Sequence, residues 1–130
     1  MNSEINLKSV KGIVKEYFSY FSSKNLNRLD EMFSEGVILR DWDIFAQGKE
    51  AVLAANNNIF ESVESISVCL KEFYQDKKTA ICLIEIEIDK QDLIKVVDVI
   101  KFNEDLKIIE VSAYKQWTIV QIIGIVDPKT

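Results

Sequence analysis

Three side chains in this sequence, a tyrosine and two aspartates, have the types and positions needed to move a proton beside a carbonyl group. One of them, Asp98, lies in the strand-like segment 93–102. Strand alternation places Asp98 on one face with Val96 and Ile100, and this apolar face should turn toward the core. A carboxyl buried among aliphatic groups raises its pKa until it is neutral, and it then donates a hydrogen bond. The pattern therefore predicts a donor facing an apolar pocket.

Tyr17 and Asp41 occupy comparable places on two other predicted elements. Tyr17 belongs to the apolar stripe of a helix, and Asp41 shares a strand face with Val37 and Leu39. If the three groups converge, an ionised carboxylate can remove a proton next to a carbonyl. The phenol and a protonated second carboxyl can then hold the enolate oxygen.

Each of these three residues also has a structural alternative. Asp98 could be a carboxylate hydrogen-bonded to Tyr17 or to the backbone, because structural networks also shift pKa values. Tyr17 could be a core aromatic residue whose hydroxyl is hydrogen-bonded within the protein. Asp41 could cap the loop before Asp43 or pair with Arg40.

Hydrophobic periodicity predicts the elements that would position these groups. An amphipathic helix is expected at 7–22, followed by a short helix that Asn25 caps and Gly36 ends. A third helix is expected at 49–60, and its three consecutive asparagines should fray its last turn. The inner stripe of this third helix is predicted to be Ala51, Val52, Ala55 and Ile59.

The rest of the chain is strand-like. One strand is expected at 37–42, with a loop to Gly48, and four more strands, joined by short polar turns, are expected at 66–74, 79–89, 93–102 and 107–116. Three helices followed by an antiparallel meander predict an α+β fold, with the helices on one side of a curved sheet. Cys69 and Cys82 should face opposite sides of the sheet, so no disulfide is expected.

Composition restricts the classes of function. The 130 residues predict a single domain, and the net charge of −5 argues against nucleic acid as a partner. No segment is long and apolar enough to suggest a membrane span or a signal peptide, so a cytoplasmic protein is expected. The absence of histidine removes imidazole catalysis and histidine-bound metals. The acidic side chains on strand 79–89, which are Glu85, Glu87 and Asp89, are expected to be a solvated face rather than a metal site.

The sequence resembles the nuclear-transport-factor-2-like superfamily, in its polyketide-cyclase-like and ketosteroid-isomerase-like branch. The resemblance covers roughly residues 10–116 of a single domain and implies that residues 117–130 are a C-terminal extension. It rests on Tyr17-Phe18 through Asn25-Leu26, on Leu29 and Met32-Phe33, and on four further segments at 37–41, 48–52, 97–103 and 107–110.

This resemblance implies a cone of curved antiparallel sheet closed by three helices around an apolar pocket, commonly in a dimer. On the isomerase pattern, Tyr17 matches the oxyanion-binding tyrosine, Asp41 the proton-shuttling base and Asp98 the protonated acid. Trp42 follows Asp41 where the pattern has proline, so the base loop should differ in shape. No cofactor and no metal are implied.

The expected ligand is a small apolar molecule, and the expected activity is a cofactor-free proton shift next to a carbonyl. The alternative is a non-catalytic dimeric module that binds a ligand or a protein. Besides the three polar groups, the pocket is predicted to be lined by Phe18, Phe21, Trp42, Ile84, Val96 and Ile100. One continuous cavity reached by Tyr17 and Asp41 would favour catalysis, whereas a cavity plugged by Trp42 or Phe45 would favour the alternative.

An apolar outer face of the sheet usually indicates a partner. Leu83, Val97 and Val99 fall on the face away from the helices, and the segment 117–126 is strongly apolar. A homodimer through this face and the C-terminal segment is therefore expected.

Overall fold

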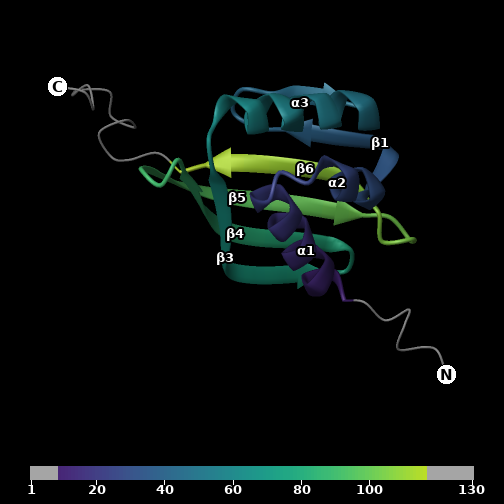
Figure 1. Ribbon diagram of the computed structural model, residues 1–130. Helices are drawn as coiled ribbons and strands as arrows, with labels where there is room; N and C mark the ends of the chain where they lie inside the picture. Colours follow the sequence, from purple (N-terminus) through teal and green to yellow (C-terminus); the bar gives the residue numbers. More distant parts are fainter. Residues whose placement is uncertain (1–8, 117–130) are drawn as a thin grey trace.

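The computed structural model describes residues 9–116, and this part of the chain consists of three helices and six strands (Figure 1). The expected α+β order of helices followed by an antiparallel meander is confirmed. The elements, in chain order, are α1 Val10–Ser22, α2 Leu26–Met32, β1 Phe33–Arg40, β2 Phe45–Gln47, α3 Lys49–Ser62, β3 Ile66–Asp76, β4 Thr79–Ile88, β5 Asp92–Phe102 and β6 Ile108–Lys115.

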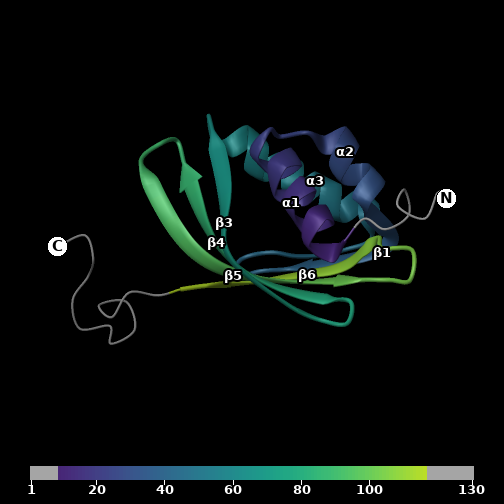
Figure 2. The same ribbon diagram turned by 90° about the horizontal axis from the view of Figure 1, so that it is seen from below.

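The six strands form one curved sheet in the order β2-β1-β6-β5-β4-β3. Strands β3 to β6 are the predicted meander, and each pairs antiparallel with the next. All three helices lie on one side of the sheet, and β3, β4 and β5 bend up around them (Figure 2). A bulge between Leu70 and Glu72 of β3 contributes to this bend, because an extra residue in one strand increases the local twist.

Helix α1 carries Tyr17 on its buried stripe. Ser9 caps the helix by accepting a hydrogen bond from the Gly12 N–H at 2.9 Å. At the other end, the Ser22 hydroxyl accepts from the Val68 N–H at 2.9 Å and so fastens α1 to β3. The inward position of Tyr17 is therefore fixed at both ends of its helix.

Strand β1 begins earlier than the sequence indicated, and the loop after it holds a strand that was not expected. Gly36 was predicted to end a helix, but it lies inside β1, which starts at Phe33 and ends at Arg40. The cause is non-local: Phe33 pairs in parallel with Ile108 of β6, and Leu39 pairs with Val111. Strand β2 adds a short antiparallel hairpin at the edge of the sheet.

Helix α3 does not fray at its asparagines, as the low helix propensity of that residue had suggested. It continues to Ser62, and Asn56 is only 2% exposed. The buried stripe runs through Val52, Asn56 and Phe60, whereas Ala51 is exposed. Tertiary contact overrides propensity here, since the Phe60 ring packs edge-on against Phe21 of α1 with centroids 4.8 Å apart.

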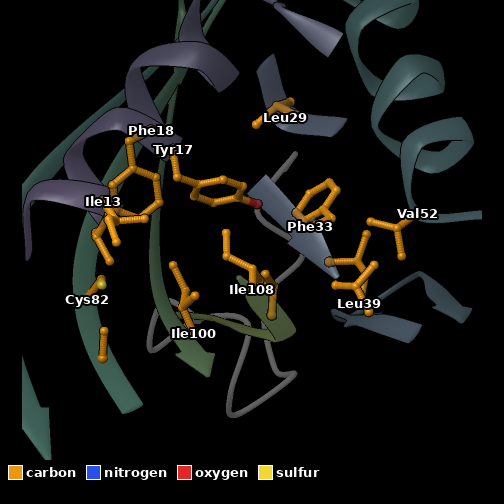
Figure 3. Close-up of a cluster of buried hydrophobic side chains, with 14 of the residues drawn as sticks. Ile13, Tyr17, Phe18, Leu29, Phe33, Leu39, Val52, Cys82, Ile100 and Ile108 are labelled. Atoms are coloured by element: carbon orange, nitrogen blue, oxygen red, sulfur yellow. The ribbon is translucent and has the colours of Figure 1, made fainter. Parts of the chain in front are cut away.

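The core lies between the helices and the sheet and joins α1, α2 and α3 to β1, β4, β5 and β6 (Figure 3). As expected, Cys69 is exposed and Cys82 is buried, and both are free thiols. Within residues 9–116, no helix has the length and apolar character of a membrane span. The predicted C-terminal extension 117–130, including the segment 117–126, lies outside the described residues.

Candidate active site

A cavity of about 230 Å³ opens between the helices and the curved part of the sheet. Its walls come from α1, α3, the loop after β1 and strands β1 and β3 to β6. Most of the lining is aliphatic or aromatic. The polar side chains among the lining residues are Tyr17, Asp41, Trp42, Asp43, Asn56 and Asp98.

The structure brings eight of the nine predicted site residues to this cavity. They are Tyr17, Phe18, Phe21, Asp41, Trp42, Ile84, Val96 and Asp98. The ninth, Ile100, was expected to line the pocket and does not, although it is fully buried. It lies one inward-facing position beyond Asp98 on β5, where core side chains of α1 and β6 fill the space (Figure 3).

Asp98 is a buried carboxyl in an apolar wall, as alternation predicted. It is 8% exposed and lies between Cys82 of β4 and Ala113 of β6. Burial, and then the charge of Asp41, raise the pKa of Asp98 to about 7. Within residues 9–116 its oxygens take part in no hydrogen bond, so the described chain does not supply the partner that a purely structural carboxylate would need.

Tyr17 presents its phenol from the opposite wall and is 4% exposed. Its ring packs against Phe18, Phe21 and Phe33 at centroid distances of 5.4, 6.1 and 6.2 Å. The pKa of the phenol is raised well above its usual value, chiefly by burial and next by the charges of Asp98 and Cys82. The hydroxyl therefore stays protonated and remains available as a donor.

The thiol of Cys82, directly across the β-ladder from Asp98, is inert for a similar reason. Burial, and then the charge of Asp98, raise the pKa of Cys82 to about 12. A thiol that keeps its proton is a poor nucleophile, which fits the expectation of a core cysteine.

Asp41 lies just after β1 and shapes the loop that follows. Its Oδ1 accepts the N–H groups of Asp43 and Ile44 at 2.7 and 2.6 Å. Asp41 therefore caps the loop, as the structural alternative predicted. It also lines the cavity, and its second oxygen, Oδ2, takes no part in the turn. Arg40 points away: it lies over the Phe45 ring at 5.0 Å and reaches Glu110 at 4.0 Å.

The two aromatic residues that were considered as plugs, Trp42 and Phe45, do not close the cavity. Trp42 lines the cavity and is 40% exposed, and the Lys115 ammonium lies 5.9 Å from its ring centroid. Phe45 is 60% exposed and is not part of the lining. Tyr17 and Asp41 consequently reach one continuous cavity, which was the arrangement that catalysis requires.

The sequence reasoning missed Asn56. Its side chain lines the cavity, and its buried Nδ2 has no hydrogen-bond partner in residues 9–116. A usable signal existed, since Asn56 lies four residues after Val52 and four before Phe60 on the buried stripe. A polar residue on an apolar stripe is the same signal that singled out Tyr17.

Of the three acidic residues considered as metal ligands, Glu85 and Glu87 lie on β4 and Asp89 follows directly after it. Asp89 accepts the N–H groups of Glu64 and Ser65 through Oδ1, at 2.7 and 3.0 Å. In the part of the chain from 9 to 116, no three cysteine, aspartate or glutamate side chains converge as metal ligands.

Comparison with known proteins places this geometry in a family. The model of the SnoaL-like domain family matches residues 14–111. A structure from Shewanella denitrificans assigned as a SnoaL-like polyketide cyclase is similar with a TM-score of 0.75 at 11% identity, over 88% of this chain and 97% of that chain. A structure from Kribbella flavida assigned as a ketosteroid isomerase is similar with a TM-score of 0.73 at 11% identity, over 84% of this chain and 78% of that chain.

A structure from Sinorhizobium meliloti assigned as a polyketide cyclase is also similar, with a TM-score of 0.71 at 17% identity, over 78% of this chain and 92% of that chain. No curated protein matches the sequence. Identities this low establish the fold and leave the activity open. The family model covers most of the chain and the α+β fold agrees with it, so this protein belongs to the SnoaL-like family of NTF2-like domains.

Proposed function

We propose that the cavity binds a small apolar carbonyl compound and that its side chains move a proton next to the carbonyl. Asp41 acts as the base, and Tyr17 and protonated Asp98 donate hydrogen bonds to the enolate oxygen. The observation that carries this proposal is that a buried carboxyl, Asp98, lacks a hydrogen bond within residues 9–116 and lines the same cavity as Asp41.

The two carboxyls divide the acid and base roles because their surroundings differ. Like charges in one cavity disfavour the doubly ionised state, so one carboxyl retains a proton. Asp98 is the more deeply buried of the two and has its pKa raised to about 7. Asp41 is partly exposed, and two backbone N–H groups hold one of its oxygens in place. This arrangement leaves Asp98 as the donor and Asp41 as the acceptor of the moving proton.

The lining supports an apolar ligand, and the similarity to proteins assigned as cyclases and isomerases agrees with proton-shift chemistry. A non-catalytic binding module is the second candidate. It is favoured by the hydrogen bonds of Asp41, which give this residue a structural purpose independent of any reaction.

Titration with para-nitrophenol, whose ionised form resembles an enolate, tests the oxyanion site. We expect the wild type to bind this probe at pH 6, and we expect Asp98→Ala to weaken binding at least tenfold because a buried donor is lost. Binding should also weaken above about pH 7, where Asp98 loses its proton. Visible absorbance of the phenolate reports both occupancy and ionisation.

Glu87→Gln is the matched control, since Glu87 is an exposed carboxylate of β4 outside the cavity lining. It should bind the probe like the wild type. Absence of binding to the wild type, or equal binding to Asp98→Ala, would remove the enzymatic proposal.

We also propose that the protein is a homodimer through the sheet face opposite the helices. On this face, Leu83 pairs with Val97 and Val97 pairs with Tyr114, while the neighbouring row contains Ile81 and Val99. Tyr114 is 62% exposed and Ile81 is 36% exposed. Apolar side chains that adjoin across three strands form the kind of patch that association covers.

The variant Ile81→Glu/Tyr114→Glu should therefore be monomeric, whereas the wild type sediments as a dimer. Repulsion and desolvation of four acidic side chains at a two-fold interface oppose association. The control Ser19→Glu/Asn27→Glu adds the same charge to exposed positions of the helical layer and should remain dimeric. Sedimentation velocity distinguishes the species, and a wild type that is monomeric at high concentration contradicts this assembly.

A further inference from the structure

Asn56 is the polar group of the cavity that the proposed proton transfer does not use. It is 2% exposed, it lines the cavity, and its Nδ2 has no hydrogen-bond partner within residues 9–116. A buried amide without a partner destabilises a fold, and such groups are rare in native proteins. Its presence on a cavity wall points to a partner outside the described residues, and a ligand bound in the cavity is such a partner.

The surroundings of Asn56 fix the amide in position. Val52 and Phe60 lie one helical turn to either side of Asn56 on α3, and both are buried. Phe60 contacts Phe21 of α1 edge-on at 4.8 Å. Since Tyr17 lies one turn before Phe21 on α1, this contact also ties together the two helices that present the phenol and the amide. A group held this way by packed neighbours is suited to orienting a ligand.

The charges around the cavity indicate which ligand the amide can receive. Three carboxyl side chains line the cavity, from Asp41, Asp43 and Asp98, and none of the described lining residues is lysine or arginine. An enolate or phenolate oxygen can be held by the proton donors Tyr17 and Asp98, but an anionic group placed beside Asn56 would be repelled by the ionised carboxyls and would lack a counter-charge. The amide nitrogen is a neutral donor, and an uncharged oxygen acceptor satisfies it at the lowest desolvation cost.

The size of the cavity restricts the ligand further. A volume of about 230 Å³ is below the range of roughly 300–1,000 Å³ that is typical of pockets for drug-sized molecules. A compact ligand on the order of one or two small rings fits this volume.

We propose that Asn56 is a specificity-determining residue that donates a hydrogen bond to a second oxygen of the ligand. The ligand class is then a compact, uncharged carbonyl compound that carries one further oxygen acceptor. This inference rests on the proposed function, because it assigns the first oxygen to Tyr17 and Asp98. Asn56 itself takes no part in moving the proton.

Paired phenols test the inference by calorimetric titration. Para- and meta-hydroxyacetophenone carry a second oxygen, and para- and meta-isopropylphenol replace that carbonyl oxygen with a methyl group of similar shape. The wild type should bind at least one acetyl compound about tenfold more tightly than its isopropyl counterpart. Asn56→Leu should remove this preference while it binds the isopropyl compounds at least as well. The unpaired amide is gone in Asn56→Leu, so this variant should also melt at a higher temperature than the wild type.

Asn56→Ala removes the donor without adding bulk to the cavity wall, and it should also lose the preference for the acetyl compounds. Circular dichroism confirms that each variant is folded, and Asn56→Ala alone suffices if Asn56→Leu does not fold. An acetyl preference that survives in a folded variant overturns the inference. Equal binding of the acetyl and the isopropyl compounds by the wild type also overturns the inference. Tighter binding of a meta-hydroxyphenyl trimethylammonium probe than of either type would mark a cation site and also overturn it.

The two proposals fail in different ways. If the acetyl preference depends on Asn56 but no ketone exchanges its protons, the proton-transfer proposal fails and the role of Asn56 stands. If exchange occurs and Asn56→Leu leaves the acetyl preference intact, the role of Asn56 fails and the proton-transfer proposal stands.

Discussion

Asp41→Asn is expected to lower the rate of α-proton exchange of a small cyclic ketone about a thousandfold. Removal of a general base typically costs between about 10² and 10⁴ in rate. The asparagine retains an oxygen that can accept the N–H groups of Asp43 and Ile44, so the loop should keep its shape. The substitution therefore separates the proton-accepting role of Asp41 from its structural role.

Incorporation of deuterium from D₂O into cyclohexanone, followed by nuclear magnetic resonance, measures this rate without knowledge of the natural substrate. Asp43→Asn is the matched control, because Asp43 is a neighbouring carboxyl that also lines the cavity. It should stay within about twofold of the wild type, since it is not the base. Equal losses in both variants would indicate a field effect of negative charge, and an active Asp41→Asn would remove Asp41 from the mechanism.

The second large effect is on stability and depends on pH. The pKa of Asp98 rises from 3.8 in the unfolded chain to about 7 in the folded protein. Between these two pH values the folded state binds more protons than the unfolded state, so the free energy of unfolding falls as the pH increases. The loss contributed by Asp98 should total about 4 kcal/mol and be complete above about pH 7.

Urea unfolding of the wild type and of Asp98→Asn across pH 4 to 8 isolates this contribution. The asparagine is nearly isosteric with aspartate and does not titrate, so the difference between the two proteins removes the effect of the surface carboxylates. Asp98→Asn should be about as stable as the wild type at pH 4 and clearly more stable at pH 8. A difference that stays constant with pH would mean that Asp98 does not carry a raised pKa in the folded protein.

The effect of pH on stability and the donor role of Asp98 have one origin, which is the burial of a carboxyl without a hydrogen-bond partner in residues 9–116. Domains are stable by about 5–15 kcal/mol, so a contribution of about 4 kcal/mol from one group is a large fraction of the total. The same burial that destabilises the fold at high pH keeps Asp98 protonated near neutrality and thereby available as a donor. Asn56 is a second unsatisfied polar group on the same cavity wall. Polar residues on apolar, core-facing positions depart from the usual sequence pattern, and such departures are expected at functional sites. Asp98 and Asn56 are two such residues.

Local pattern was sufficient to predict most of the elements and the direction of most side chains. The period of α1 placed Tyr17 on the buried stripe, and alternation in β5 placed Asp98 inward opposite Cys82. Strand and helix periods reflect which face of an element is buried, and that information is contained in neighbouring residues. The meander followed from the same rule, because short turns join strands that pair with their neighbours in sequence.

Only the tertiary structure decided what depends on contacts between distant segments. The early start of β1 follows from the pairing of Phe33 with Ile108, and the full length of α3 follows from the contact of Phe60 with Phe21. Whether an inward residue reaches a cavity or the packed core is equally non-local, which is why Asp98 lines the cavity and Ile100 does not. Sequence periodicity shows that a side chain points inward, but the space it meets there is set by other elements.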